Sequence, residues 1–371
     1  MKKVNGFEII QLFEQFSPKE YAMEGDKIGL QIGRLNKPVE NVMITLDVLE
    51  DVVDEAIAKN VQLIIAHHPP IFRPIQKLVT DTPQGRMLEK LIKHDIAVYA
   101  AHTNLDVTPG GVNDLLAEAL GLENVELLAP TYEAKLKKLV VFVPKTHSEI
   151  VREALGNAGA GAIGNYSHCS FSAEGTGYFL PGEHTNPFIG KTGEIEAVSE
   201  ERIETIFPSA HEKRILTAML KAHPYEEVAF DIYPLANKGL ELGLGRIGTI
   251  SEMTLSQFAQ LVKQTFGVSG VRVIGDLNAT VKKVAVLGGD GGKYWPQAKF
   301  KGADVYVTGD MYYHVAHDAM VAGLNIVDPG HHVEMVMKQG VTKVLTNKCA
   351  DKGYKVNVFP SELVTDPFQF L

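Results

Sequence analysis

The chain of 371 residues contains only two cysteines, Cys169 and Cys349, which lie far apart in the sequence. Two such residues build neither a disulfide framework nor a cysteine-rich metal motif. No apolar run approaches the length of about 20 residues that a transmembrane helix needs. The first stretch also lacks the apolar core of a signal peptide, because Glu8, Gln11 and Glu14 interrupt it. These absences predict a soluble, cytoplasmic protein without a membrane partner.

Basic residues are in the minority, with 36 Lys and Arg against 45 Asp and Glu and a net charge of −9. A general nucleic-acid binder would carry a basic surface, so nucleic acid is not expected as a partner. Hydrophobic residues make up 45% of the chain and charged residues 22%, which is typical of globular proteins. A chain of this length is expected to form two or three domains.

Strands and amphipathic helices alternate in two separate parts of the chain, from residue 39 to 122 and again from residue 284 onward. Such alternation predicts an α/β domain with parallel or mixed sheets covered by helices. Its two halves are expected over residues 1–130 and 238–371. The main strands are predicted over residues 42–46, 61–66, 96–100, 284–287, 305–307 and 324–327.

The segment between these halves, residues 135–236, has a different pattern. Its elements follow the order β-α-β-β-α-β, which is typical of a ferredoxin-like α+β unit. We expect this unit to be a domain inserted into a loop of the α/β domain, because the termini of such units often lie close together. Strands are predicted around residues 138–143, 168–171, 177–180 and 228–233, an extended stretch at 194–198, and helices over 150–156 and 212–222.

Two adjacent histidines, His67 and His68, follow the apolar strand that ends at Ala66. On a regular strand their side chains would point to opposite faces of the sheet. Pro69 and Pro70 end the strand and impose extended or turn geometry, which allows both rings to converge. Neutral imidazole is the commonest protein ligand of zinc and related metals, so the pair indicates a metal site.

Two other predicted strand ends carry the same residue types. One is followed by His102 and Asp106. The other leads into a predicted helix where His331 and Glu334, three residues apart, share one face, while His332 faces elsewhere. Ligands of open α/β sheets bind outside the carboxyl ends of the strands. The predicted metal ligands are therefore His67, His68, Asp106, His331 and Glu334.

This set is larger than one catalytic zinc ion needs, since such an ion takes three protein ligands and a water. The surplus predicts two divalent metal ions that share a bridging carboxylate, roughly 3.5–4 Å apart. Zinc is the first expectation for the metal, with iron or manganese as alternatives.

Several blocks of this sequence resemble the signature motifs of the GTP cyclohydrolase 1 type 2 family, also called the Nif-three-like dinuclear-metal proteins. In the two α/β halves they are residues 28–33, 66–69, 102–106, 307–310, 330–334 and 366–369. The middle segment is similar to the PII- and CutA-related insert of the longer bacterial members. The blocks that carry this second resemblance are Glu174–Gly177, Pro187–Gly190 and His223–Glu227.

The resemblance implies a binuclear metal site made of the same five side chains. It also implies a ring-shaped homo-oligomer, a homohexamer, with the site facing an interior cavity. One block departs from the pattern, because many members have an acidic-Trp-Asp-Asn run where this chain reads Glu24-Gly25-Asp26-Lys27. A pocket that uses that tryptophan would differ here, and substrate preference with it.

The leading functional hypothesis is metal-dependent hydrolysis of a small molecule, with a nucleotide as the candidate substrate. In the cyclohydrolase version, metal-bound hydroxide attacks the imidazole ring of guanine in GTP, the ring opens and formate leaves. His102 and His314 are the predicted catalytic residues, as proton shuttles with pKa values near working pH. Each of them has an alternative role as support for a metal ligand.

Two alternatives stay open at this point. Paired metals equally suit a phosphoesterase, and the backbone amides of residues 288–292 would then bind phosphate. That glycine-rich stretch lacks the lysine and the Ser or Thr of a P-loop, so a tight turn is favoured. The other alternative is a non-catalytic regulatory or scaffold protein, in which the metal ions are fully coordinated.

Overall fold

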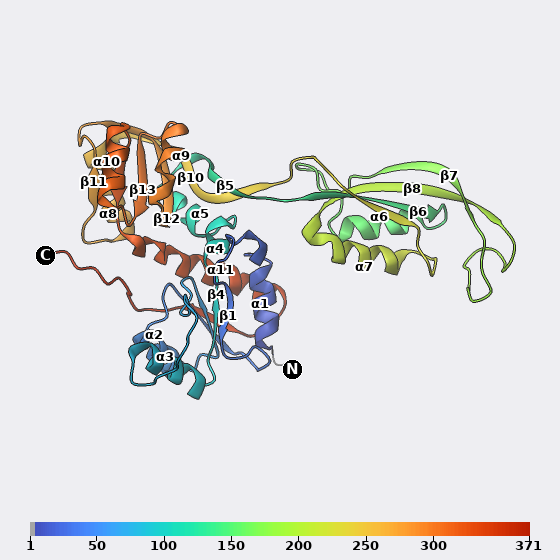
Figure 1. Cartoon of the computed structure of the whole chain (residues 1–371), viewed down its shortest axis with the longest axis horizontal. Coiled ribbons are helices and arrows are strands. Elements are labelled where there is room, and N and C mark those ends of the chain that lie inside the picture. The colour runs from blue at the N-terminus through green and yellow to red at the C-terminus, as the bar shows by residue number, and fades with distance from the viewer. Residues whose placement is uncertain (1–3) are drawn as a thin grey trace. The chain divides into compact units, whose positions relative to one another are not determined.

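The computed structural model describes residues 4–371, so the first three residues of the predicted N-terminal half lie outside the described part. The chain divides into two compact units. Unit 1 consists of the residues up to Tyr132 together with Leu242–Leu371, and unit 2 consists of Glu133–Glu241. Both units are shown in Figure 1.

The first sheet of unit 1 has five strands in the order β1-β4-β3-β2-β15. Strands β15, β2, β3 and β4 are parallel, and β1 pairs with β4 in the antiparallel sense. The predicted parallel arrangement is therefore confirmed, with β15 supplied by the far end of the chain. The strands are β1 (Gly29–Ile32), β2 (Asn41–Thr45), β3 (Leu63–Ala66), β4 (Ala97–Ala100) and β15 (Asn357–Pro360).

The second sheet of unit 1 has six strands in the order β11-β14-β13-β12-β10-β5. Strands β12, β13 and β14 are parallel, whereas β10 and β11 pair in the antiparallel sense. The sheet is therefore mixed, and β5 belongs to the N-terminal half of the chain. The strands are β5 (Glu123–Glu133), β10 (Glu241–Thr254), β11 (Arg272–Ile274), β12 (Thr280–Asp290), β13 (Val305–Gly309) and β14 (Asn325–Asp328).

Helices cover both faces of each sheet. Between the two sheets, α1 (Gly6–Glu14), α5 (Val112–Ala119), α8 (Leu255–Phe266) and α11 (Val336–Asp351) share one hydrophobic core with them (Figure 1). On the outer face of the five-stranded sheet lie α2 (Glu50–Ala58) and α3 (Pro83–Lys93). On the outer face of the six-stranded sheet lie α9 (Trp295–Phe300) and α10 (Tyr313–Val321).

Local sequence signals explain where two of these helices begin and end. Helix α8 starts at a capping box, in which Thr254 accepts a hydrogen bond from the backbone of Gln257 and the Gln257 side chain bonds back. It ends at Gly267, whose φ of 63° is left-handed and therefore costs glycine little. Asn5 and Glu8 form a second capping box at the start of α1.

Unit 2 has the element order β-α-β-β-α-β and one antiparallel sheet with the strand order β7-β8-β6-β9. Helices α6 and α7 pack with the hydrophobic side chains of this sheet. The elements are β6 (Leu136–Pro144), α6 (Ser148–Asn157), β7 (Phe171–Phe179), β8 (Glu196–Pro208), α7 (Glu212–Ala222) and β9 (Phe230–Pro234).

One prediction for unit 2 was wrong. The two short strands expected around residues 168–171 and 177–180 are a single strand, β7, which pairs without a break along β8 from Phe171 to Phe179. His168 precedes the strand and has a φ of 60°, which is incompatible with extended structure. The extended stretch expected at 194–198 is the beginning of the long strand β8.

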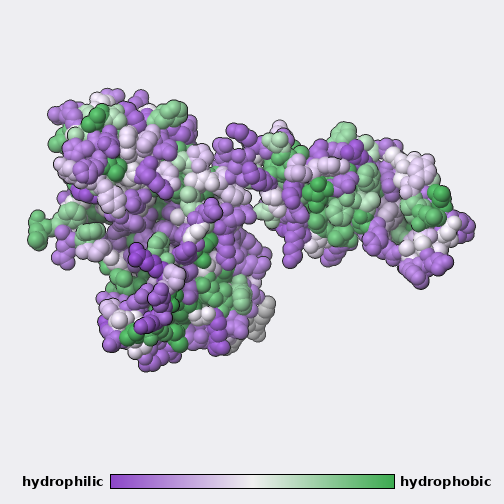
Figure 2. Space-filling view, in the orientation of Figure 1, coloured by the Kyte–Doolittle hydropathy of each residue, from purple (hydrophilic) through white to green (hydrophobic). Residues whose placement is uncertain are grey.

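None of the described helices combines the length and the apolar character that a membrane span requires. Figure 2 shows hydrophobic residues gathered on the surface over α6 and α7 of unit 2. Ile150 of α6 is 54% exposed there and Leu220 of α7 is 50% exposed.

Candidate metal centre

His67 and His68 lie directly after β3, where the strand ends and the chain leaves the sheet. The His67 side chain is fully buried, and its Nδ1 lies 2.9 Å from the carbonyl oxygen of Ala101. Because a carbonyl only accepts, this contact places the proton of the neutral ring on Nδ1. The Nε2 lone pair of His67 is then free to bind a cation.

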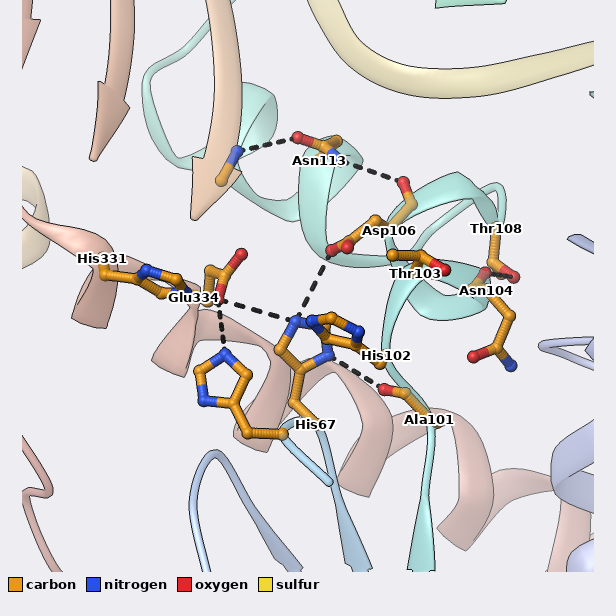
Figure 3. Close-up of polar contacts among 12 residues, drawn as sticks. His67, Ala101, His102, Thr103, Asn104, Asp106, Thr108, Asn113, His331 and Glu334 are labelled. Atoms are coloured by element: carbon orange, nitrogen blue, oxygen red, sulfur yellow. Dashed lines mark hydrogen bonds and ion pairs between the residues drawn. The ribbon is translucent and has the colours of Figure 1, made fainter. Parts of the chain in front are cut away.

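Glu334 is the centre of the cluster. It lies in a short 3-10 helix, His331–Met335, that follows β14, and it is 3% exposed. Its Oε2 atom lies 3.1 Å from Nε2 of His68, 3.2 Å from Nε2 of His331 and 3.6 Å from Nε2 of His67. Figure 3 shows the side chains of His67, His331 and Glu334 pointing toward one another from different parts of the chain.

Asp106 completes this group from the short helix α4 (Thr103–Val107). Its Oδ1 lies 3.6 Å from Nε2 of His67, a distance too long for a hydrogen bond. Among the described residues, both of these atoms are buried and have no hydrogen-bond partner. A cation between a bare imidazole nitrogen and a buried carboxylate oxygen would satisfy both, so the donor set fits a metal ion.

Three overlapping groups of side chains could each hold a metal ion, with their ligand atoms within 4.8 Å of one another. Two of the groups share Glu334, so its carboxylate could bind metal ions at two neighbouring positions. The groups are His67, Asp106 and Glu334; His68, His331 and Glu334; and His67, His68 and His102. The structure thus brings together all five side chains that the sequence predicted as ligands.

His102 is a further donor at this site. It precedes α4, and its ring centroid lies 5.3 Å from that of His67. Its Nδ1 lies 2.8 Å from Oδ1 of Asp26, whose other oxygen accepts a hydrogen bond from the backbone of Thr103. These partners fix the orientation of the ring beside the cluster.

In two of the other imidazole rings, the nitrogen that does not contact Glu334 lies within hydrogen-bond distance of a carboxylate. Asp47 lies 2.6 Å from Nδ1 of His68, and Asp310 lies 2.7 Å from Nδ1 of His331. Asp310 has a φ of 54°, a left-handed conformation that aspartate tolerates better than most residues. Such carboxylate–histidine pairs orient metal ligands and increase their basicity.

Sequence reasoning did not assign these roles to Asp26, Asp47 and Asp310. Asp47 and Asp310 closely follow β2 and β13, and β3 and β14 are the neighbouring strands whose ends lead to His68 and His331. An acidic residue after a predicted parallel strand was therefore the available signal. Asp26 carried no such signal because it lies in a loop before β1.

The electrostatics of the cluster follow from its burial and its charges. Burial by itself would lower the pKa of His68, but hydrogen bonds to Asp47 and Glu334 raise it to about 10. His331 behaves alike, since Glu334 and Asp310 outweigh burial and raise its pKa to about 9.

The two carboxylates respond in opposite directions. Burial raises the pKa of Asp106 to about 6, although the nearby His67 favours the charged form. For Glu334 the three surrounding imidazoles outweigh burial and keep its pKa well below the usual range.

The glycine-rich end of β12 and the residues after it pack against the cluster. A Cβ atom added to Gly289, which has a φ of +66°, would lie 2.6 Å from Oε1 of Glu334, so only glycine fits there. Three amides of this segment are already used: Gly288 donates to Asn113, Gly291 to Thr308 and Gly292 to Asp290. These three amides are thus not free to bind phosphate. The tight turn expected over residues 288–292 is not what the structure has up to Asp290, because β12 continues to that residue with a register shift after Val286.

His314 and His332 lie outside the three groups of possible ligands formed by the described residues. His314 is the second residue of α10. Its exposed ring contacts that of Tyr313, with 5.4 Å between the ring centroids. The geometry supports a role at the site for His102 and offers no contact that supports one for His314. His332 is buried beside the cluster, and burial lowers its pKa.

Comparison with known proteins extends these observations to the whole chain. Residues 4–367 match the family described as Duf34/NIF3 (NGG1p interacting factor 3). A Bacillus subtilis protein named GTP cyclohydrolase 1 type 2 homolog is 66% identical over 371 residues, covering 100% of both chains.

Two solved structures share the fold across their entire lengths. A Bacillus cereus protein described as related to NIF3 has a TM-score of 0.96 at 63% identity, and a Staphylococcus aureus protein has a TM-score of 0.79 at 33% identity. Each covers 100% of this chain and is itself covered completely. The resemblance seen in the sequence blocks is thus confirmed, and the chain belongs to the Duf34/NIF3 family.

Proposed function

We propose that this protein is a hydrolase that uses two divalent metal ions and acts on a small molecule of the nucleotide type. The observation that carries the proposal is the position of Glu334, whose Oε2 atom lies within 3.6 Å of three imidazole nitrogens. A carboxylate surrounded in this way can bridge two cations. The name shared by the close relatives, GTP cyclohydrolase 1 type 2 homolog, favours GTP as the first substrate to test.

The side chains divide into two roles. His67, Asp106 and Glu334 would hold one ion, and His68, His331 and Glu334 the other. Paired divalent ions, when bound, lower the pKa of water toward ~7 and supply hydroxide at neutral pH. Zinc is the expected metal, and iron and manganese are the alternatives.

We assign His102 the role of proton carrier for this reaction. Asp26 holds its Nδ1 and leaves the other ring nitrogen for exchange with substrate. In the cyclohydrolase reaction one water opens the imidazole ring of guanine, and a second releases formate. His102 would move protons between these waters and the ring nitrogens.

The decisive experiment loads the purified full chain with zinc, manganese or iron in separate samples and follows GTP by mass spectrometry. We expect metal-dependent release of formate and a ring-opened triphosphate. Glu334→Gln should abolish the product. The matched control is Glu89→Gln, which removes an exposed carboxylate of α3 that pairs with Lys93.

Absence of product with every metal at high protein concentration would remove the cyclohydrolase assignment. A panel of nucleotides and phosphodiesters in the same assay tests the phosphoesterase alternative. Two metal ions per chain without turnover of any substrate would favour the regulatory or scaffold role. Metal analysis alone therefore separates failure of the site from failure of the substrate.

Two further expectations from the sequence belong to this proposal. The homohexameric ring and the cytoplasmic location are inferred from the family blocks and the composition. We also propose that unit 2 is an inserted domain related to PII and CutA proteins, which its β-α-β-β-α-β order supports.

A further inference from the structure

A large cavity lies in unit 2. It measures about 670 Å³, within the range of small-molecule sites. The three sequence blocks singled out in this unit all contribute to its wall, through Glu174–Gly177, Pro187–Ile189 and Tyr225–Glu227. None of these residues has a role in the metal centre.

The cavity lies on the face of the sheet opposite to α6 and α7. In β8, Ile203 and Phe207 pack with these two helices, whereas Glu200 and Arg202 line the cavity. Side chains alternate between the faces of a strand, so the even-numbered residues here face the cavity. Ala173 and Gly175 of β7 pair with Arg202 and Glu200, and a Cβ atom added to Gly175 would meet nothing within 4 Å.

Glu200 is a buried carboxylate without a cationic partner among the described residues. It is 7% exposed, and its one hydrogen bond comes from the hydroxyl of Tyr225, 3.1 Å from Oε1. A Cβ atom added to Gly177 would lie 2.2 Å from Oε2, so the carboxylate lies directly on β7. Leaving a buried charge unpaired is costly, which makes Glu200 a site of attraction for a cation.

The positive groups near the cavity are engaged elsewhere. Arg202 pairs with Glu204 at 2.9 Å, and Lys145 pairs with Glu174 at 2.7 Å. Besides Glu174, which Lys145 neutralises, three glutamates line the cavity against a single arginine: Glu200, Glu226 and Glu227. This excess of negative charge disfavours phosphates and carboxylates as ligands.

Aromatic rings gather around Tyr225, whose hydroxyl donates to the buried carboxylate. The ring centroid of Tyr225 lies 5.9 Å from that of Phe179 and 6.3 Å from that of Phe188. His223 packs on the other side of Tyr225 at 5.1 Å. Aromatic faces attract cations and stack on flat rings, so they complement the charge of Glu200.

We propose that this cavity binds a small organic cation with a flat body, whose N–H groups donate to Glu200 while its body packs against Tyr225, Phe179 and Phe188. Amidinium and protonated aminoheterocyclic groups have this chemistry, because they present adjacent N–H donors to a carboxylate. The site is separate from the metal centre, and its ligand class differs from a nucleoside triphosphate. The proposal therefore does not depend on the proposed function.

Benzamidine is the probe for this chemistry, since its planar amidinium matches a carboxylate. Benzamide and benzoate have nearly the same shape and are neutral and anionic. Calorimetric titration of the full chain should give a Kd for benzamidine at least about tenfold below that for benzamide, as expected for a charge-assisted hydrogen bond. Benzoate should not bind.

Three variants locate the binding. Glu200→Gln should raise the Kd for benzamidine about tenfold or more. Gly175→Leu should abolish binding by filling the cavity, and it should fold, because a Cβ atom at this position meets nothing within 4 Å. The control, Glu149→Gln, removes an exposed carboxylate of α6, on the other face of the sheet, that pairs with Arg152 and does not line the cavity, so it should leave the Kd unchanged.

The proposal is overturned if benzamidine does not bind the unaltered chain, if benzoate or benzamide binds equally well, or if Glu200→Gln leaves the Kd unchanged. It is also overturned if Gly175→Leu shifts the oligomeric state in sedimentation, because a second copy of the chain would then occupy the cavity. Metal content should be the same in all variants, which confirms that unit 1 is intact.

Discussion

The two sites of this molecule use buried carboxylates in opposite ways. In unit 1, Glu334 lies among three imidazole rings, and Asp47 and Asp310 hold two of these rings from behind. In unit 2, Glu200 faces a cavity of about 670 Å³ with a single tyrosine hydroxyl as its partner. The first site is a dense network of polar side chains, and the second is an open cavity with one buried carboxylate in its wall.

This difference teaches where each site obtains its selectivity. Dense opposite charges in a buried network favour a compact cation with fixed coordination geometry, as metal ions have. A carboxylate in the wall of a cavity with aromatic side chains favours a ligand that combines a positive charge with a flat apolar surface. Changes in charge should therefore alter both sites, whereas changes in shape should alter the second site alone.

The largest effect is expected from Glu334→Gln. The amide removes the charge that both metal positions share, so elemental analysis should find less than one metal ion per chain instead of about two. Glu200→Gln is the counterpart in unit 2 and should leave the metal content unchanged. Equal metal content in Glu334→Gln and the unaltered chain would contradict the assignment of a bridging carboxylate.

A strong dependence of metal binding on pH is expected next. In the metal-free protein the pKa of His68 is raised to about 10 and that of His331 to about 9. Both rings are therefore positively charged at pH 7, with a proton on each nitrogen. A metal ion must displace these protons. The logarithm of the association constant should rise by about one per pH unit for each proton displaced, and competition titrations from pH 6 to pH 8.5 would measure it. A constant affinity over this range would show that the rings are not ligands.

A smaller effect is expected from Asp47→Asn. The amide keeps the shape of the side chain but holds His68 less firmly, which should weaken metal binding about 10- to 100-fold. The control is Asp54→Asn, which alters an exposed carboxylate of α2 that pairs with Lys90. Metal affinity, measured with a chromophoric chelator, should be unchanged in the control.

The smallest effect is expected from Ile203→Val in the core of unit 2, where the side chain is fully buried. Loss of one methylene group should lower the free energy of unfolding by about 0.5–1.5 kcal/mol, detectable as a shift in urea midpoint. Metal content should not change, because this residue belongs to the core of the other unit. Loss of metal in this variant would mean that the two sites are coupled.

The fold of unit 1 was predicted well where the sequence pattern is local. Apolar runs such as Leu63–Ala66 and Ala97–Ala100 are strands, and histidines that follow them lie in the groups of side chains that could hold a metal ion. The division into two sheets was not predicted, because β15 joins β2 and β5 joins the second sheet from distant parts of the chain. Periodicity shows which residues are extended, but it does not show which strands pair.

In unit 2 the limit was of another kind. Two strands were expected, around 168–171 and 177–180, yet β7 runs without a break from Phe171 through Gly175 and Gly177 to Phe179. These glycines matter because they lack a side chain. At Gly177 this allows the Glu200 carboxylate to lie against the strand, and at Gly175 it leaves the cavity open. Glu200 itself lies outside the extended stretch expected at 194–198, and the sequence singled it out for no role.

The sequence by itself determined the residue types at the strand ends, the family and the alternation that produces an α/β fold, because each of these depends on neighbours along the chain. Only the tertiary structure decided how closely Glu334 approaches His67 and His68, more than 260 positions away, and that Glu200 has no cationic partner among the described residues. Contacts between distant side chains depend on how the sheets and helices pack, and packing is a property of the whole folded chain.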